Sequence, residues 1–544
     1  MVQTSASPLL SKAETPTITS LLQGMRLELV QEILPKYLPH QRWFGGKSKV
    51  ILSARISSSV TLAGGEYAVA CVEVIYADQA VESYQLPLAI ACGEVAEELQ
   101  RAAPKAILAN LGITPDDAST GYVLFDATAS EGFRQSLLDL FNKPGNAGAE
   151  ITASRSLAFL PQTLSGMRSR VGSTEQSNTS ILFGEQAILK LFRRVQPGEN
   201  PDVEMTRFLT DVTHFKNIPA YLGELHRSSD QTTLAFLQAF APNQGDGWSW
   251  FAEELARFYE SVEDCTSPAS RGKPASFLNC AEIPTKVQEH AGLALNAATL
   301  LGTRTAEMHL ALATPTDDSA FTAQAATRED LAHDAARVRD QAERAMAALQ
   351  RSVASVPNDL ADRAALLLSR RDDLLYRAQA LAVGSPEDFG QRLRIHGDYH
   401  LGQLLRVESD FFIVDFEGEP ARPLAERREK QSPLKDVAGM LRSFSYASQS
   451  ALEPYVQRHP EKADMLSAWA SLWENAVSTS FLEAYSEAMQ QRSDLIPQPP
   501  QAEVMLLAFL LEKSLYELLY ELNNRPTWLH IPLNALLVLA SNTA

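Results

Sequence analysis

The chain is poor in cysteine and has no long apolar run. Its 544 residues contain four cysteines, and none of them forms a Cys-x-x-Cys pair. This composition argues against a zinc ribbon or a dithiol redox site and fits a reducing compartment. There is neither a membrane-length apolar stretch nor a basic segment leading into an apolar one near the start. We therefore expect a cytoplasmic protein without a membrane partner.

Positive charge is also scarce. Lys and Arg number 48 against 66 Asp and Glu, which gives a formal net charge of −18. Because nucleic acids and anionic membranes bind basic surfaces, neither is an expected partner. The balance still allows a local basic pocket for phosphate. A hydrophobic fraction of 45% is enough for a large core and excludes general disorder.

The pattern of expected elements changes along the chain. Residues 1–20 are rich in Ser, Thr and Pro and are expected to be mobile. A short helix and then alternating β-branched runs predict a small α+β unit over 21–125. Residues 126–240 include a hairpin signal at Gly184-Glu185. Long helical patterns dominate 241–544, so a mixed front half precedes a mostly helical back half.

The densest group of chemically useful residues begins after a short apolar stretch and Gly397. Asp398 comes first, Gln403 follows, and Asp415 ends an apolar strand. Phosphoryl transfer needs such a set, because one carboxylate accepts the proton of the attacking hydroxyl. The carboxamide and the second carboxylate then supply hard oxygen ligands for Mg²⁺. A turn with a purely structural Asp is the alternative, and the joint spacing disfavours it.

Two histidines flank Asp398. His396 and His400 have a spacing that binds metals on a helix, but Gly397 is a poor helix residue and no third ligand is evident. We expect His396 to hydrogen-bond the loop backbone instead.

A lysine also lies within an apolar strand. Lys190 needs a partner or a ligand there, because a buried ammonium is costly. Glu204 is the expected partner, in the arrangement that orients a kinase lysine towards nucleotide phosphates. Asp202 competes for that role if the helix register differs, and an edge lysine that reaches solvent is the structural alternative.

The turn before this strand is the expected phosphate-covering loop. It runs over 175–180 and includes Ser177, Asn178 and Thr179. Backbone amides and hydroxyl groups of such a turn can hold phosphate. The loop is not Gly-rich, and no GxxxxGK[ST] segment occurs in the chain. A P-loop enzyme is therefore disfavoured.

Acidic and basic side chains follow Asp415 in close succession. Glu417 and Arg422 are the strongest candidates to bind a polyhydroxyl ligand, with Lys435 further along. Carboxylate and guanidinium groups take sugar hydroxyls in pairs, and aromatic rings cover a sugar face. Tyr399 is one candidate ring. A solvated, salt-bridged segment is the alternative for any one of these residues.

These segments together resemble bacterial maltokinases. The matching stretches are RWFGGKSK, EQSNTS, LKLFRRVQPGENPDVEMTRFL, LQAFAPNQGDGW, LGTRTAEMHLAL, HGDYHLGQLL, IVDFEGEPARPLAERREKQSPLKDVAGMLRSFSYA and EKSLYELLYELNNRPTWLHIPL. They occur in the family's order from about residue 42 to 533. The combination is specific, whereas an isolated His-Gly-Asp is shared with aminoglycoside and choline kinases.

The resemblance implies an α+β, bilobal protein-kinase-like fold. An N-terminal cap subdomain over 21–125 would precede a five-stranded intermediate subdomain over 126–240 and a helical C-lobe over 241–544. The activity implied is ATP- and Mg²⁺-dependent phosphorylation of maltose at its anomeric hydroxyl. The product, α-maltose 1-phosphate, would feed α-glucan (glycogen) synthesis. Insertions around 263–290 and 315–385 interrupt no motif.

Roles follow from the same resemblance. Asp398 would be the catalytic base, Gln403 and Asp415 the Mg²⁺ ligands, and Lys190 with Glu204 the phosphate-binding pair. The remaining expected contacts with nucleotide are Ser177, Asn178, Thr179 and, at the hinge that holds adenine, Gln238, Ala239 and Phe240. The expected contacts with sugar are His396, Tyr399, Glu417, Arg422 and Lys435.

Two alternatives remain open. A related glucosamine kinase uses a similar His-Gly-Asp pattern, so the acceptor could be another sugar or an aminosugar. Members of the family also occur fused to trehalose synthase, which suggests a non-catalytic partner subunit of that enzyme as a second alternative. Because a non-catalytic relative usually loses a catalytic residue, the intact set around Asp398 argues against it.

Overall fold

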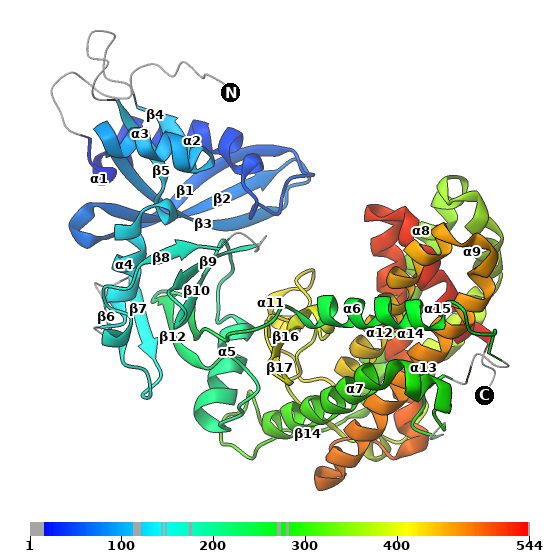
Figure 1. The fold of residues 1–544 in the computed structure, drawn as a ribbon. Coiled ribbons are helices and arrows are strands. Elements are labelled where there is room, and N and C mark those ends of the chain that lie inside the picture. The colour runs from blue at the N-terminus through cyan, green and yellow to red at the C-terminus, as the bar shows by residue number, and fades with distance from the viewer. Residues whose placement is uncertain are drawn as a thin grey trace. The chain divides into compact units, whose positions relative to one another are not determined.

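The computed structural model describes residues 16–111, 121–142, 145–146, 150–172, 177–268, 272, 274–278 and 282–541. Most of the segment expected to be mobile, residues 1–20, lies outside this part. Within it, helix α1 (Ile18–Leu21) is the first element. The chain forms two compact units (Figure 1). The first unit is Met1–Arg207 with Pro219–Pro242, and the second is Phe208–Ile218 with Asn243–Ala544.

A six-stranded antiparallel sheet opens the first unit, with the order β1-β2-β3-β5-β4 and β11 paired to β3. Its strands are β1 (Ile51–Leu62), β2 (Tyr67–Tyr76), β3 (Val81–Cys92), β4 (Ile107–Asn110), β5 (Tyr122–Asp126) and β11 (Arg194–Val195). Even-numbered residues of β2 pack against α2 (Gly24–Tyr37), and Val69 faces the opposite side. This is the two-residue period that the sequence shows. Helix α3 (Gly93–Ala102) follows β3.

The second sheet of this unit has seven strands in the order β6-β7-β12-β13-β10-β9-β8. Its strands are β6 (Gly145–Asn146), β7 (Ile151–Arg155), β8 (Ser169–Val171), β9 (Asn178–Phe183), β10 (Ala187–Phe192), β12 (Tyr221–Arg227) and β13 (Thr233–Ala239). The hairpin predicted around Gly184 is the β9–β10 pair. The five strands expected were too few, because short edge strands extend the sheet on both sides.

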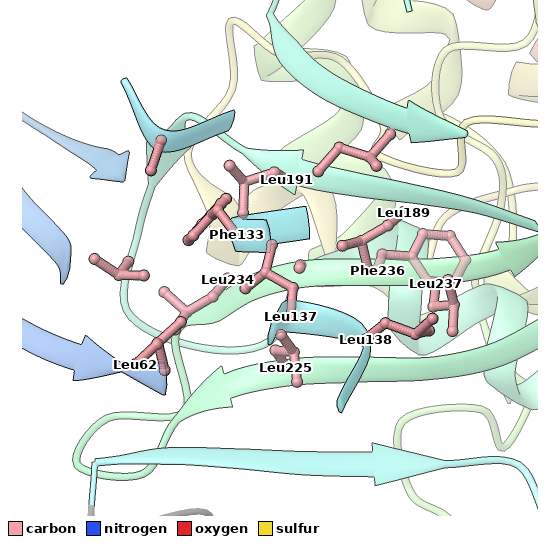
Figure 2. Packing of buried hydrophobic residues seen from close by; sticks show 14 of the residues in the cluster. Leu62, Phe133, Leu137, Leu138, Leu189, Leu191, Leu225, Leu234, Phe236 and Leu237 are labelled. Atoms are coloured by element: carbon pink, nitrogen blue, oxygen red, sulfur yellow. The ribbon is translucent and has the colours of Figure 1, made fainter. Parts of the chain in front are cut away.

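Helix α4 (Glu131–Leu140) packs on this second sheet (Figure 2). Its Phe133, Leu137 and Leu138 lie with leucines of the central strands in one buried cluster. Helix α5 (Pro201–Arg207) follows β11 and precedes β12. A face of aromatic and aliphatic side chains at helical spacing thus contributes to the core that supports β10.

One buried arginine connects the two sheets. Arg193 pairs with Asp126 at 2.8 Å, and its Nε donates to the Thr179 hydroxyl at 2.7 Å. Its guanidinium also lies 4.6 Å from the ring centroid of Trp43. Gln85 on β3 adds hydrogen bonds to the backbone oxygens of Phe192 and Leu234, each at 3.0 Å. The first sheet therefore holds the end of β10 in place.

We expect Asp126→Asn to destabilise the protein strongly. The amide leaves Arg193 buried without its counter-charge, and breaking a buried pair from one side costs about 3–5 kcal/mol. Urea denaturation measures the loss. The control is Glu73→Gln, because Glu73 pairs with Arg55 on the surface of β1 and β2, where an ion pair contributes about 0–1 kcal/mol. Equal losses in the two variants would contradict the assignment.

The second unit is helical apart from short strands. Its longer helices are α6 (Gly247–Val262), α7 (Thr285–Leu312), α8 (Arg328–Ser352), α9 (Ala361–Ser369), α10 (Arg371–Gln379), α12 (Leu434–Arg458), α13 (Ala463–Met489), α14 (Pro499–Asn524) and α15 (His530–Ser541). Helices α9 and α10 are separated only by Arg370. None of the helices in the described part of the chain combines the length and hydropathy that crossing a bilayer requires.

Helix α12 is the centre of this unit. It packs on α6, α13 and α14, and nearly all of its first fifteen residues are buried. The hairpin of β16 (Leu404–Val407) and β17 (Asp410–Ile413) lies close to α6. A loop that is hydrogen-bonded to α12 is therefore attached to the buried core of the unit.

Candidate active site

The loop before β16 is held by a buried carboxylate on α12. Asp436 accepts the backbone N–H of His396 at 2.8 Å and that of Gly397 at 2.9 Å. His309 Nε2 lies 3.1 Å from the same carboxylate. Burial alone would raise the pKa of Asp436, but the bond to His309 and the loop amides lower it below its ordinary value. Gly397 has φ 82°, a conformation that favours glycine.

His396 is an internal support of this loop. Its Nε2 lies 3.0 Å from the Val414 backbone oxygen, and its ring packs on Tyr399 and Phe416. The Tyr399 hydroxyl lies 3.0 Å from the hydroxyl of Thr305, and the residue is almost fully buried. His396 and Tyr399 thus support the loop through buried contacts. Their contact with sugar stays a prediction.

Asp398 faces a lysine that the sequence analysis did not single out. Lys513 Nζ on α14 donates to Asp398 Oδ1 at 3.1 Å, and His400 Nε2 lies 3.9 Å from Oδ2. Burial raises the pKa of Asp398, but Lys513 and the two neighbouring histidines together lower it below its ordinary value. Burial lowers the pKa of His400. At neutral pH Asp398 is therefore an ionised carboxylate beside a neutral imidazole.

The β16–β17 hairpin brings the two expected Mg²⁺ ligands together. Gln403 Nε2 donates to Asp415 Oδ2 at 3.2 Å, and the Val414 N–H donates to the Gln403 backbone oxygen at 3.0 Å. Asp415 has φ 69°, which is strained for a residue with a side chain. A carboxylate oxygen of Glu417 lies within 4.8 Å of one of Asp415. These hard oxygen donors fit the ligand preference of Mg²⁺.

A cavity opens beside Asp398. Four residues on one face of α14, spaced like successive helical turns, line it: Phe509, Glu512, Lys513 and Tyr516. The other lining residues are Gln341, Gly397, Asp398, Tyr399, Glu419, Arg422, Lys435, Asp436 and Gly439. The expected base and three of the expected sugar-binding residues, Tyr399, Arg422 and Lys435, thus share one cavity of the second unit.

The charges around this cavity form a network centred on Glu512. This carboxylate accepts from Arg337 at 2.7 Å and from Arg422 at 3.0 Å, and Lys435 Nζ lies 3.6 Å away. Arg422 also donates to Glu419. Burial lowers the pKa of Lys435 to about 8. Sequence reasoning missed Glu512, whose signal was a carboxylate on the apolar face of α14.

Glu417 belongs to a different part of the loop. Arg427 Nη1 donates to its backbone oxygen at 3.1 Å and lies 4.0 Å from its carboxylate. Glu417 is not among the residues that line the cavity. Its position near Asp415 suits a metal environment as well as a sugar contact, so its role stays a prediction.

In the first unit, Lys190 lies on β10 and is buried. Its Nζ donates to Asp202 Oδ2 at 2.9 Å, which is the competing partner that the sequence left open. Glu204 is buried on the same helix α5. The expected phosphate loop is described from Ser177 onward, and its residues 175–176 lie outside the described part.

The remaining nucleotide-binding candidates lie on or beside strands of the same sheet. Asn178 and Thr179 begin β9, and the Thr179 hydroxyl accepts from Arg193. Gln238 and Ala239 end β13, and the next residue, Phe240, donates its backbone N–H to Gln186 at 2.9 Å. Residues 238–240 precede the change from the first unit to the second after Pro242. Their contact with nucleotide stays a prediction.

The sequence is similar to that of a known cap domain and to those of two sugar kinases. Residues 37–129 match the family model of the maltokinase N-terminal cap domain. A glucosamine kinase from Streptacidiphilus jiangxiensis is 26% identical over 411 residues, which is 72% of this chain and 80% of that protein. A glucosamine kinase from Mycolicibacterium smegmatis is 27% identical over 416 residues, covering 75% and 87% of the two chains.

Solved structures show the same fold. A glucosamine kinase crystal structure matches with a TM-score of 0.62 and 21% identity, over 94% of this chain and 99% of that one. Glucosamine kinase in complex with glucosamine, ADP and inorganic phosphate matches with a TM-score of 0.58 and 22% identity, over 94% and 98%. The α+β kinase-like fold with an N-terminal cap is thereby confirmed. The chain thus has the fold of these kinase structures, and its residues 37–129 match the maltokinase N-terminal cap domain.

Proposed function

We propose that the protein is an ATP-dependent sugar kinase that phosphorylates maltose at its anomeric hydroxyl, giving α-maltose 1-phosphate. The observation that carries the proposal is Asp398, paired with Lys513, at the wall of a cavity lined by several charged side chains. The cap domain supports maltose as the acceptor, and the fold supports phosphoryl transfer. The product would serve α-glucan synthesis.

The residues then act as follows. Asp398 orients the acceptor hydroxyl and takes its proton late in the transfer, so it needs no raised pKa. Gln403 and Asp415 would hold Mg²⁺, which neutralises charge that develops on the transferred phosphoryl group. Lys190 would bind the nucleotide phosphates, oriented by the carboxylates of α5. Most of the rate would come from positioning and electrostatics.

A neutral acceptor fits the charges of the cavity better than an aminosugar does. Asp398 is bound by Lys513, Glu419 by Arg422, and Glu512 by Arg337 and Arg422. Asp436 is held by loop amides and His309. An incoming ammonium group would have to displace one of these partners, whereas hydroxyl groups can add to them.

We expect maltose to exceed glucosamine by at least about tenfold in kcat/KM, a difference of roughly 1.4 kcal/mol. An ADP-release assay with a panel of sugars measures this, and phosphorus NMR of the product locates the phosphate. The named relatives keep glucosamine as the second candidate, and a faster reaction with glucosamine would replace maltose. If no sugar supports turnover and trehalose synthase binds tightly, the protein is a non-catalytic partner instead.

A further inference from the structure

Lys513 differs from the other cations that line the cavity. Arg422 and Lys435 both lie against Glu512. Lys513 instead donates to Asp398 at 3.1 Å, and its Nζ lies 5.2 Å from the ring centroid of Tyr516. Lys513 is therefore the cavity cation that pairs with the expected catalytic carboxylate, whereas Arg422 and Lys435 lie against Glu512.

The contact engages only one oxygen of Asp398. Lys513 donates to Oδ1, whereas His400 Nε2 lies 3.9 Å from Oδ2, beyond hydrogen-bonding distance. The side chains of Lys513 and Asp398 are 27% and 20% exposed, so both remain accessible from the cavity. Oδ2 is left for a hydroxyl group that approaches through the cavity.

Helix α14 makes this arrangement specific. Glu512 precedes Lys513 and is locked by the arginines, and Glu517 one turn later accepts from Arg442 at 2.7 Å. The helix is therefore anchored on both sides of Lys513. A lysine on an anchored helix presents its charge at a defined place, which a lysine on a loop would not do.

We propose that Lys513 is a positioning and specificity-determining residue: it holds Oδ1 of Asp398 so that Oδ2 meets the acceptor hydroxyl, and its ammonium occupies the place where an amino group of the acceptor would approach that carboxylate. The specificity part rests on the proposed function. It follows that removing the ammonium should impair a neutral acceptor and favour an aminosugar, because Asp398 would then be an unpaired carboxylate.

Steady-state kinetics of Lys513→Met, Lys513→Arg and the control Lys462→Met test the proposal. Lys462 pairs with Glu263 and Asp264 far from the cavity lining. We expect Lys513→Met to lower kcat with maltose about 10–100-fold and to raise the glucosamine-to-maltose ratio of kcat/KM at least about tenfold. Lys513→Arg should keep most of the activity, and Lys462→Met all of it. An unchanged ratio in Lys513→Met would overturn the specificity part.

The positioning part has a test that does not depend on the substrate. In protein labelled with ¹³C at the Asp carboxyl carbons, the signal that Asp398→Asn removes belongs to Asp398. The groups that face this carboxyl are Lys513 on α14 and the loop residues His396 and His400. We expect its pKa to rise in Lys513→Met and to stay low in Lys513→Arg. The same pKa in wild type and Lys513→Met would overturn the positioning role, even if no sugar is phosphorylated.

Discussion

Asp398→Asn is expected to lower kcat by about 10²–10⁴-fold while the protein stays folded. The carboxamide has the size of the carboxylate but cannot accept the proton of the attacking hydroxyl. It also cannot form the ion pair that Asp398 makes with Lys513, whose Nζ lies 3.1 Å from Oδ1 of the native carboxylate. A coupled ADP-release assay measures kcat, and the thermal unfolding midpoint by circular dichroism checks the fold.

Asp410→Asn is the matched control for this variant. Asp410 is an aspartate of the same unit that begins β17 and pairs with Arg304 at 2.8 Å. It does not line the cavity, so its replacement is expected to affect stability more than turnover. A normal kcat in Asp398→Asn would refute the base assignment, and equal losses in both variants would point to the fold rather than the chemistry.

The second large effect is expected for Asp415. Replacing it by Ala should weaken Mg²⁺-dependent ATP binding by on the order of 100-fold, because one of the two proposed protein ligands to the metal is lost. Titration calorimetry with ATP in the presence and absence of Mg²⁺ separates the metal-dependent part. Binding of ATP without metal should change little, since Lys190 and the β9–β10 hairpin are untouched.

Backbone strain requires a second variant here. Asp415 has φ 69°, and Asn tolerates that conformation better than Ala does. Asp415→Asn should therefore fold well and still lose most of the metal dependence. Glu408→Ala, in the turn of the same hairpin and also at positive φ (56°), controls for the hairpin itself. Unaltered Mg²⁺ dependence in Asp415→Asn would exclude Asp415 as a ligand.

The fold was predictable where a periodic pattern is long. Alternating and apolar runs in the region of β1 to β3, and the long helical patterns of the second unit, indicated those elements. The prediction was less successful at short strands. Strand β7 was not predicted, because a run of only five residues carries little local signal. Its pairing with β12 supplies the missing stabilisation.

The candidate site shows the same division. The spacing of Asp398, Gln403 and Asp415 was visible because a single loop and hairpin carry all three, and the structure brings the last two into contact. Lys513, His309 and Glu512 were missed. Each lies on a helix distant in sequence from the loop, where a polar residue among apolar ones has no meaning until its partner is known.

By itself the sequence determined the general order of its elements and the kinase-like motifs, because these depend on neighbours along the chain. Only the tertiary structure decided which groups adjust the chemistry. Packing α12 and α14 beside one loop places Asp436 under the backbone amides and Lys513 beside Asp398. Burial then strengthens the electrostatic interactions of these few charges, since water screens them less than at the surface.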